Sequence, residues 1–280
     1  MKSNFSEPHI GASLQNIARS KVMFLVFHVL FVSSWFLHDS NLLGSLLVWF
    51  FLQFGVHAGY HRYFAHGSFR TYPWMEFLLA CMGCLAFQNG PFWWASKHRA
   101  HHQVADTEKD LHSPIHGFWH AHIGWLWQAN VVHIDWQLIP DLCRPIPIWV
   151  ERNQVNIHLF YVSCLVFIFG WSSLLTLWIV PTVLCWHTTF ATNSICHKLG
   201  SQPFETRPYG YCTAGNNVVV GIINLGEGWH NNHHAFPTCS HHGFHRWYQL
   251  DIIYLALLMF EKLNILWGLK KRTNACNRQI

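Results

Sequence analysis

LLGSLLVWFFLQFGVHAGYHRYFAH, residues 42–66, joins a long apolar run to a pair of histidines. The run from Leu42 to Gly59 carries no charged residue, and its length of about 18 residues is close to the minimum that crosses a bilayer as a helix. His61 and His66 follow directly, and imidazole is a common ligand of transition metals. The stretch therefore predicts an integral membrane protein with a metal site where a helix leaves the bilayer.

Three further apolar runs resemble the first one in length and composition. They cover residues 22–37, 155–171 and 173–190, and the short polar loops between them indicate two helical hairpins. Only 11% of the 280 residues are charged, against about 25% in an ordinary soluble chain. We expect an all-α integral membrane fold in one domain, with four transmembrane helices and a cytosolic helical cap that is formed by residues 60–153 and 191–280.

The basic residues indicate the orientation of this fold. Neither predicted hairpin loop, residues 38–41 or 171–173, contains Lys or Arg, so all 18 basic residues lie on the other side. The positive-inside rule makes that side cytoplasmic, and we expect a bacterial inner membrane rather than the endoplasmic reticulum. Residues 74–87 and 252–266 are also apolar, but we interpret them as surface helices of the cap. A net charge of +5 gives no reason to expect a nucleic-acid partner.

Histidines occur in three clusters, here called boxes. The second box is His98-Arg-Ala-His101-His102, and the third is His230-Asn-Asn-His233-His234. Residues i, i+3 and i+4 share one face of a helix, so each of these boxes presents three aligned imidazoles. The first box, His61 to His66, has an i, i+5 spacing and needs a helix end or an irregular helix to converge.

Eight histidines exceed the four ligands of one tetrahedral zinc site, so the boxes predict two metal ions. Imidazole suits iron, zinc and copper. The chain has 23 histidines, and we expect the others to be ordinary. His9, His28, His38, His57, His158 and His187 are predicted to pack in the core or at interfaces, and His241, His242 and His245 to be solvated. Cys81 and Cys84 have a C-x-x-C spacing, but in an apolar helix we interpret them as packing residues.

DLHSPIHGFWHAHIGW after the second box and NLGEGWHNNHHAFP around the third resemble the membrane fatty acyl desaturases. That family includes stearoyl-CoA desaturase and bacterial acyl-lipid desaturases, and the resemblance covers nearly the whole chain. It implies an oxidoreductase that uses O2 and a non-haem centre of two iron ions to place a cis double bond, at the delta-9 position, in a saturated acyl chain.

The resemblance also implies roles for individual residues. Asn193-Ser-Ile-Cys-His197 matches a family motif in which the histidine is a ninth ligand and the asparagine holds a metal-bound water. Asp110, His112 and His122 match positions around the centre, and Gln88, Asn89 and Trp94 match the substrate path. The implied metal ligands are His61, His66, His98, His101, His102, His197, His230, His233 and His234.

The acyl carrier stays open between CoA and a membrane lipid. The animal acyl-CoA enzymes carry basic residues after a Gly-Trp-Leu block and before the second box, whereas here the residues after Gly124-Trp125-Leu126 and before Lys97 are neutral. Electrons are expected from a separate protein of ferredoxin, rubredoxin or cytochrome b5 type. The alternative function is a histidine-box hydroxylase or ketolase acting on alkanes, sterols or carotenoids. A metal transporter is disfavoured because transporter sites lie near the membrane midplane.

Overall fold

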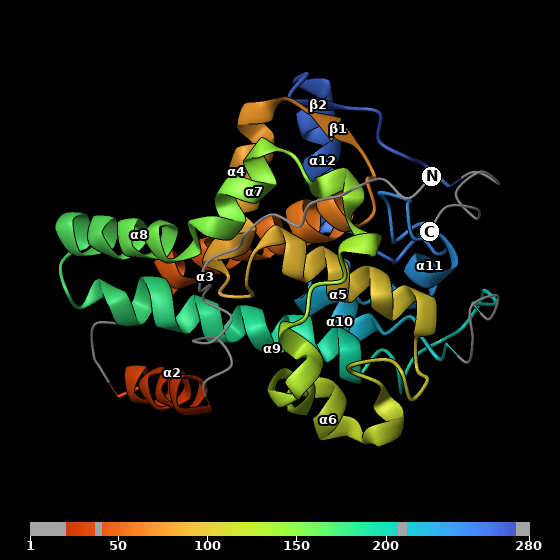
Figure 1. The fold of residues 1–280 in the computed structure, drawn as a ribbon, viewed down its shortest axis with the longest axis horizontal. Coiled ribbons are helices and arrows are strands. Elements are labelled where there is room, and N and C mark those ends of the chain that lie inside the picture. Colours follow the sequence, from red (N-terminus) through yellow and green to blue (C-terminus); the bar gives the residue numbers. More distant parts are fainter. Residues whose placement is uncertain (1–20, 37–40, 207–211, 273–280) are drawn as a thin grey trace.

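The computed structural model describes residues 21–36, 41–206 and 212–272, and most of them are helical (Figure 1). The α-helices are α2 (Lys21–Ser34), α3 (Leu42–Phe54), α4 (Pro73–Leu85), α5 (Pro91–Val104), α6 (Phe118–His122), α7 (Pro145–Arg152), α8 (Gln154–Phe169), α9 (Val180–Ser194), α10 (Val218–Ile223), α11 (His230–Ala235) and α12 (Ile252–Lys262). Two π-helices are η1 (Gly55–Ala65) and η7 (Leu175–Ile179), and short 3-10 turns are η2 (Pro114–His116), η3 (Gly124–Trp127), η4 (Ala129–Val132), η5 (Trp136–Leu138) and η6 (Pro140–Leu142).

Among the described residues, one helix is both long and apolar enough to cross a membrane. It runs from Leu42 to Ala65 and consists of α3 and η1. The helices at two other predicted spans, α2 and α8, are apolar but shorter. The fourth predicted span forms η7 and α9, which follow one another directly. The helical fold is thus confirmed, whereas the four-span topology stays a prediction.

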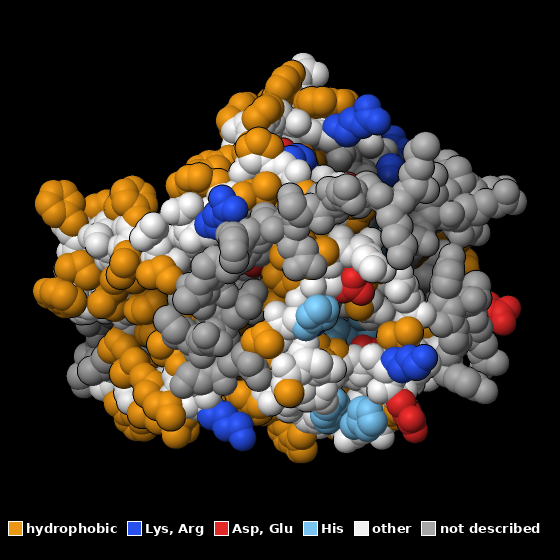
Figure 2. Space-filling model, in the orientation of Figure 1, with side chains coloured by type: hydrophobic (Ala, Val, Ile, Leu, Met, Phe, Trp, Pro, Cys, Tyr) orange, Lys and Arg blue, Asp and Glu red, His pale blue; other side chains and the backbone are white. Residues whose placement is uncertain are grey.

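Apolar side chains are exposed at one end of the molecule. In Figure 1, α8 and α9 extend to the same side, and the hydroxyl of Tyr161 on α8 donates to the Leu177 carbonyl at 2.7 Å. Orange side chains gather over α8 and α2 at the left of Figure 2. Phe167 on α8 is 91% exposed and Val22 on α2 is 70% exposed. Exposed apolar surface of this extent is typical of a face that contacts lipid or another protein.

The first histidine box lies on the π-helix η1. The backbone N–H of His66 donates to the carbonyl of His61 at 3.1 Å, which is an i, i+5 hydrogen bond. A π-helix carries more residues per turn than an α-helix, so residues five apart come onto nearly the same face. The irregular helix that the i, i+5 spacing requires is therefore present.

The two predicted surface helices are present with one correction. α4 follows the prediction closely, but α12 ends at Lys262, four residues early. Asn264 has a φ of +55°, a left-handed conformation that is common after helix ends. The chain then forms β2 (Leu266–Trp267), which pairs antiparallel with β1 (Arg70–Thr71), so Leu266 lies in a short strand where the prediction had the end of a helix. This pairing holds the segment after α12 beside the start of α4.

η1 packs unusually close to α4, because glycines face the neighbouring helix. A Cβ atom at Gly55 would collide with the backbone of Met82 and Gly83. A Cβ atom at Gly83 would lie 2.5 Å from the ring of Tyr60. Backbone atoms cannot move aside as a flexible side chain can, so the close approach requires glycine. The contact sets the position of the helix that carries the first box.

We expect Gly55→Ala to lower the free energy of unfolding by about 1–3 kcal/mol, because an added methyl group overpacks a rigid contact. Thermal unfolding of the detergent-solubilised protein measures the effect. Gly124→Ala is the control, since its Cβ atom would meet its nearest neighbour at an ordinary 3.4 Å. Equal melting temperatures for the two variants would contradict the proposed close packing.

Candidate metal centre

Five histidines converge on one buried point, and we call them the five-histidine group. They come from η1, α5 and α11, and their ligand atoms lie within 4.8 Å of one another. Nε2 of His98 lies 2.8 Å from Nε2 of His66 and 3.0 Å from that of His102. Nε2 of His233 lies 2.9 Å from that of His102. The members are His61, His66, His98, His102 and His233.

Four other histidines form a second buried cluster, the four-histidine group. His101 comes from α5, His197 from the end of α9, and His230 and His234 from α11. Nε2 of His230 lies 2.9 Å from that of His197 and 3.0 Å from that of His234. The two groups interleave along α5 and α11, since His101 and His102 are neighbours in sequence but belong to different groups. All nine predicted histidines are thus brought together, in two sets.

The Nε2 spacing fits a metal ion better than hydrogen bonding. A neutral imidazole has one N–H, and three of these rings direct Nδ1 at a carboxylate, which leaves a lone pair on Nε2. Lone pairs that face one another repel unless a cation lies between them. Metal–nitrogen distances of about 2.1 Å at right angles give about 3.0 Å between ligand atoms, close to the spacing here. The donor set therefore fits one transition-metal ion in each group.

Three carboxylates orient ligand rings by contacting Nδ1, the ring nitrogen opposite the inward-facing Nε2. Glu227 lies 2.7 Å from Nδ1 of His61, Asp110 lies 2.9 Å from Nδ1 of His101, and Asp106 lies 2.8 Å from Nδ1 of His197. Such partners fix the tautomer and make the ligand nitrogen a better donor. Burial opposes ionisation of Asp110 and Asp106, but the facing His101 and His197 hold the pKa of each carboxyl below its usual range.

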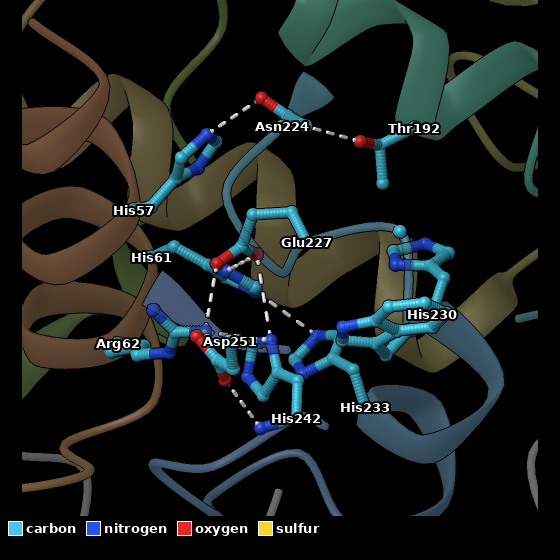
Figure 3. Close-up of polar contacts among 12 residues, drawn as sticks. His57, His61, Arg62, Thr192, Asn224, Glu227, His230, His233, His242 and Asp251 are labelled. Atoms are coloured by element: carbon cyan, nitrogen blue, oxygen red, sulfur yellow. Dashed lines mark hydrogen bonds and ion pairs between the residues drawn. The ribbon is translucent and has the colours of Figure 1, made fainter. Parts of the chain in front are cut away.

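A buried arginine joins Glu227 to the N-terminus of α12 (Figure 3). Nη2 of Arg62 contacts Glu227 at 3.0 Å and Asp251, the N-cap of α12, at 3.0 Å. It also lies 3.1 Å from Nδ1 of His242. The prediction that His242 is solvated was wrong: its ring is fully buried, and its centroid lies 4.7 Å from that of the His233 ring. Its sequence neighbours are polar, and only the folded chain brings it against the first box.

The charges around the nine imidazoles do not cancel. Glu227, Asp106, Asp110 and Asp251 are four buried carboxylates, and Arg62 is the one buried Lys or Arg among the described residues. With neutral imidazoles, the net charge of these groups is −3. Uncompensated buried charge is strongly unfavourable, so the site calls for cations. Two divalent ions would supply four positive charges.

A cavity adjoins the centre, and several aromatic side chains line it. Trp186, Phe87 and Phe190 form apolar walls, and His98 and Asn193 bring the metal-ligand region to its surface. The aromatic lining suits an alkyl chain, because such a chain has no polar atoms to satisfy. The predicted substrate residues Gln88, Asn89 and Trp94 all line this cavity.

The link between α4 and α5 holds these residues in an unusual backbone conformation. Phe87 and Asn89 both have positive φ, at +58° and +64°. Non-glycine residues in this region are uncommon and cluster at functional sites. The Gln88 amide donates to Thr189 on α9 at 3.2 Å and accepts from the Trp94 indole at 3.2 Å. The link therefore turns Gln88 into the cavity beside the metal groups.

Residues 40–254 match the family model described as fatty acid desaturase. The chain belongs to the fatty acid desaturase family. A curated relative from Nostoc, sn-2 palmitoyl-lipid 9-desaturase, is 34% identical over 95% of this chain and 95% of its own. An Acyl-CoA C20 Delta5-desaturase from Anemone leveillei is 34% identical over 88% and 81%. Icosanoyl-CoA 5-desaturase from Limnanthes douglasii is 31% identical over 94% and 74%.

Membership establishes the general chemistry of this desaturase. The family makes it an oxidoreductase and places it among membrane-associated proteins. Its buried histidine groups are suited to metal binding. The named relatives differ in carrier and in double-bond position, since they include lipid and CoA desaturases with delta-9 and delta-5 specificity.

The remaining predicted residues of the desaturase lie at different distances from the ligands. His112 lies beside Asp110, and its ring contacts that of His101 with the centroids 4.3 Å apart. Asn193 lines the cavity next to the ligand region. His122 instead hydrogen-bonds Ser194 at 2.9 Å, and its other nitrogen lies 3.0 Å from His187.

His122 is part of a chain of three imidazoles that links α6, α9 and α2. Nε2 of His187 lies 2.8 Å from Nε2 of His28, and Nδ1 of His28 faces the Phe24 carbonyl at 2.6 Å. A carbonyl only accepts, so a neutral His28 donates from Nδ1 and accepts from His187 at Nε2, and His187 in turn accepts from His122 at Nδ1. The predicted packing role of His28 and His187 is confirmed, as it is for His57 and His158, which bond Asn224 and Cys84. His9 and His38 lie outside the described residues.

Sequence reasoning missed Glu227, Asp106, Arg62 and Asp251. A signal was present for two of them: acidic residues number only 13, and Glu227 and Asp106 stand within four residues of a box. Arg62 follows the first histidine of the first box directly. No local signal marks Asp251, because it reaches the site only through the fold. Buried Cys84 and half-buried Cys81 pack on α4 as expected.

We expect Glu227→Gln to lower metal affinity by about 10–100-fold, because a neutral amide orients and activates His61 less well than a carboxylate. Chelator competition with Zn²⁺ or Fe²⁺ measures the affinity. Glu205→Gln removes an exposed carboxylate instead and should leave the affinity unchanged. An unaltered affinity in Glu227→Gln would show that Glu227 does not support a ligand.

Proposed function

We propose that this chain is an O2-dependent fatty acyl desaturase with a di-iron centre. The observation that carries the proposal is the pairing of two buried imidazole groups, with a net charge of −3 around them, beside an apolar cavity. Iron suits imidazole ligands, and family membership supports redox chemistry over mere metal storage. The nine histidines are the proposed ligands.

Two iron ions, held by the nine histidines, would supply the O2 chemistry that removes hydrogen from unactivated methylene groups. The reaction takes two hydrogens from adjacent carbons, and with O2, two electrons and two protons it yields a cis double bond and two waters. We place the double bond at delta-9. The electrons come from a separate ferredoxin, rubredoxin or cytochrome b5 type protein.

The residues of the chain bind and orient. The aromatic cavity walls hold the acyl chain and exclude water, so the distance from the carboxyl end to the irons sets the position attacked. Asp106, Asp110 and Glu227 hold the ligand rings. Asn193 is the proposed holder of a metal-bound water, because it lines the cavity with His98 and stands four residues before His197, a member of the group with fewer ligands.

We propose that the protein is a single domain with four transmembrane helices and that the metal centre lies on the cytoplasmic side of a bacterial inner membrane. The exposed apolar side chains of α2 and α8 support contact with lipid at one end (Figure 2). In Figure 1, α5 and α11, which carry the second and third boxes, lie on the side of the molecule away from α8. The one-sided basic residues support the cytoplasmic assignment.

We expect His101→Ala and His233→Ala each to abolish unsaturated product in a host that lacks its own desaturase, because each removes a ligand from a different group. Gas chromatography of total acyl chains measures the product. His133→Ala removes an exposed histidine and should retain activity at equal expression. Product from either ligand variant would overturn the di-iron proposal, and hydroxylated product from the unaltered chain would favour the hydroxylase alternative.

Lys97 is a cation on the cavity lining, and its Nζ donates to the Asn130 carbonyl at 3.1 Å. Both candidate carriers, CoA and a phospholipid, carry anionic phosphate groups. We expect Lys97→Met to raise KM about tenfold, the effect of losing one charge-assisted hydrogen bond of about 1.5 kcal/mol. Lys97→Arg is the matched control and should keep KM.

Assays with palmitoyl-CoA and with a phosphatidylglycerol carrying palmitate at sn-2 identify the carrier, since turnover of one alone assigns it. Equal KM values for Lys97→Met and the unaltered protein on the accepted carrier would rule out carrier recognition by this lysine.

A further inference from the structure

We propose that the two iron sites are electrically unequal, and that the ion in the four-histidine group is oxidised first and re-reduced last. This inference rests on the proposed di-iron function. It comes from the carboxylates that contact Nδ1 of the ligand rings. These carboxylates differ between the two histidine groups in number and in whether a nearby cation offsets their charge.

Two full negative charges stand behind the four-histidine group. Asp110 accepts from His101 and from the backbone N–H groups of Asp106 and His112. Asp106 accepts from His197 and from the hydroxyl and backbone N–H of Thr213. All these donors are neutral when the histidines are metal ligands. The negative charge of both carboxylates therefore remains to act on the ion.

The five-histidine group has one carboxylate behind it, and that charge is shared with a cation. Glu227 contacts Nδ1 of His61 through one oxygen and Nη2 of Arg62 through the other. Figure 3 shows Arg62 between Glu227 and Asp251, with His242 beside them. Asp251 accepts from Arg62 and from two backbone N–H groups, and does not contact a ligand ring. Arg62 thus offsets the charge behind His61.

The difference in charge has a definite consequence for oxidation. Negative charge in a low-dielectric interior stabilises an ion more as its own charge rises, so it favours the ferric state over the ferrous state. The effect is larger at the four-histidine group, because two uncompensated carboxylates act there. Fewer imidazoles also leave room for a water, and an added oxygen ligand favours the ferric state further.

Redox titration of the purified desaturase, loaded with ⁵⁷Fe²⁺ in lipid nanodiscs, tests this inference. Ferricyanide accepts one electron per iron, and Mössbauer and electron paramagnetic resonance spectra follow each step. We expect two separate one-electron steps with a mixed-valence intermediate. Asp110→Asn should raise the midpoint potential of the first step and leave that of the second step nearly unchanged. Asp110→Glu keeps the negative charge, so its first midpoint potential should match that of the unaltered protein.

A variant of Arg62 changes the charge near the five-histidine group instead. Arg62→Met leaves Glu227 uncompensated, so the second potential should fall and the two steps should approach each other. If Asp110→Asn or Arg62→Met folds poorly, Asp106→Asn repeats the test made with Asp110→Asn. Glu205→Gln, which removes an exposed carboxylate, is the control. Two results would overturn this inference and leave the proposed function standing. One is a single two-electron step in the unaltered protein, and the other is an effect of Asp110→Asn or Asp106→Asn that is confined to the second step. Protein that folds but never holds two irons overturns the proposed function with it.

Discussion

The structure depends on holding nine imidazoles, with their lone pairs directed inward, in a buried site. Without cations this arrangement is unfavourable, because the Nε2 atoms repel one another and four buried carboxylates face one guanidinium. Metal binding would therefore contribute to folding as well as to chemistry. The rest of the molecule can be understood as the framework that keeps these groups together at contact distance.

That framework uses a different local geometry for each ligand set. The first box needs the π-helix η1, whereas the second and third boxes need only one regular helical turn each. Gly55 and Gly83 let η1 approach α4 closely, and Arg62 ties η1 to the N-terminus of α12. A shift of any one helix would move one ligand set against the others.

The cavity shares its walls with this framework. The strained link at Phe87 and Asn89 connects α4 to α5, so the residues that turn into the cavity are next to the helix that carries the second box. The chain from His28 through His187 to His122 ties α2 to α9 and α6, and Phe24 on α2 lines the cavity. Binding of an alkyl chain and orientation of the metal ligands therefore depend on the same packed elements.

The sequence by itself determined the helical class, the approximate positions of the long apolar helices and the clustering of the eight box histidines. It could do so because hydrophobic runs and i, i+3, i+4 spacings are local properties of the chain. It also indicated that the first box needs an irregular helix. Family resemblance, rather than spacing, supplied His197, which the structure places in the four-histidine group.

Only the tertiary structure decided how the histidines divide into two groups and which charges stand behind each. Neighbours such as His101 and His102 belong to different groups because their side chains point about 100° apart on α5. Asp251 and the buried ring of His242 reach Arg62 across 180 residues or more. Such contacts depend on how distant helices pack, and no periodicity along the chain records them.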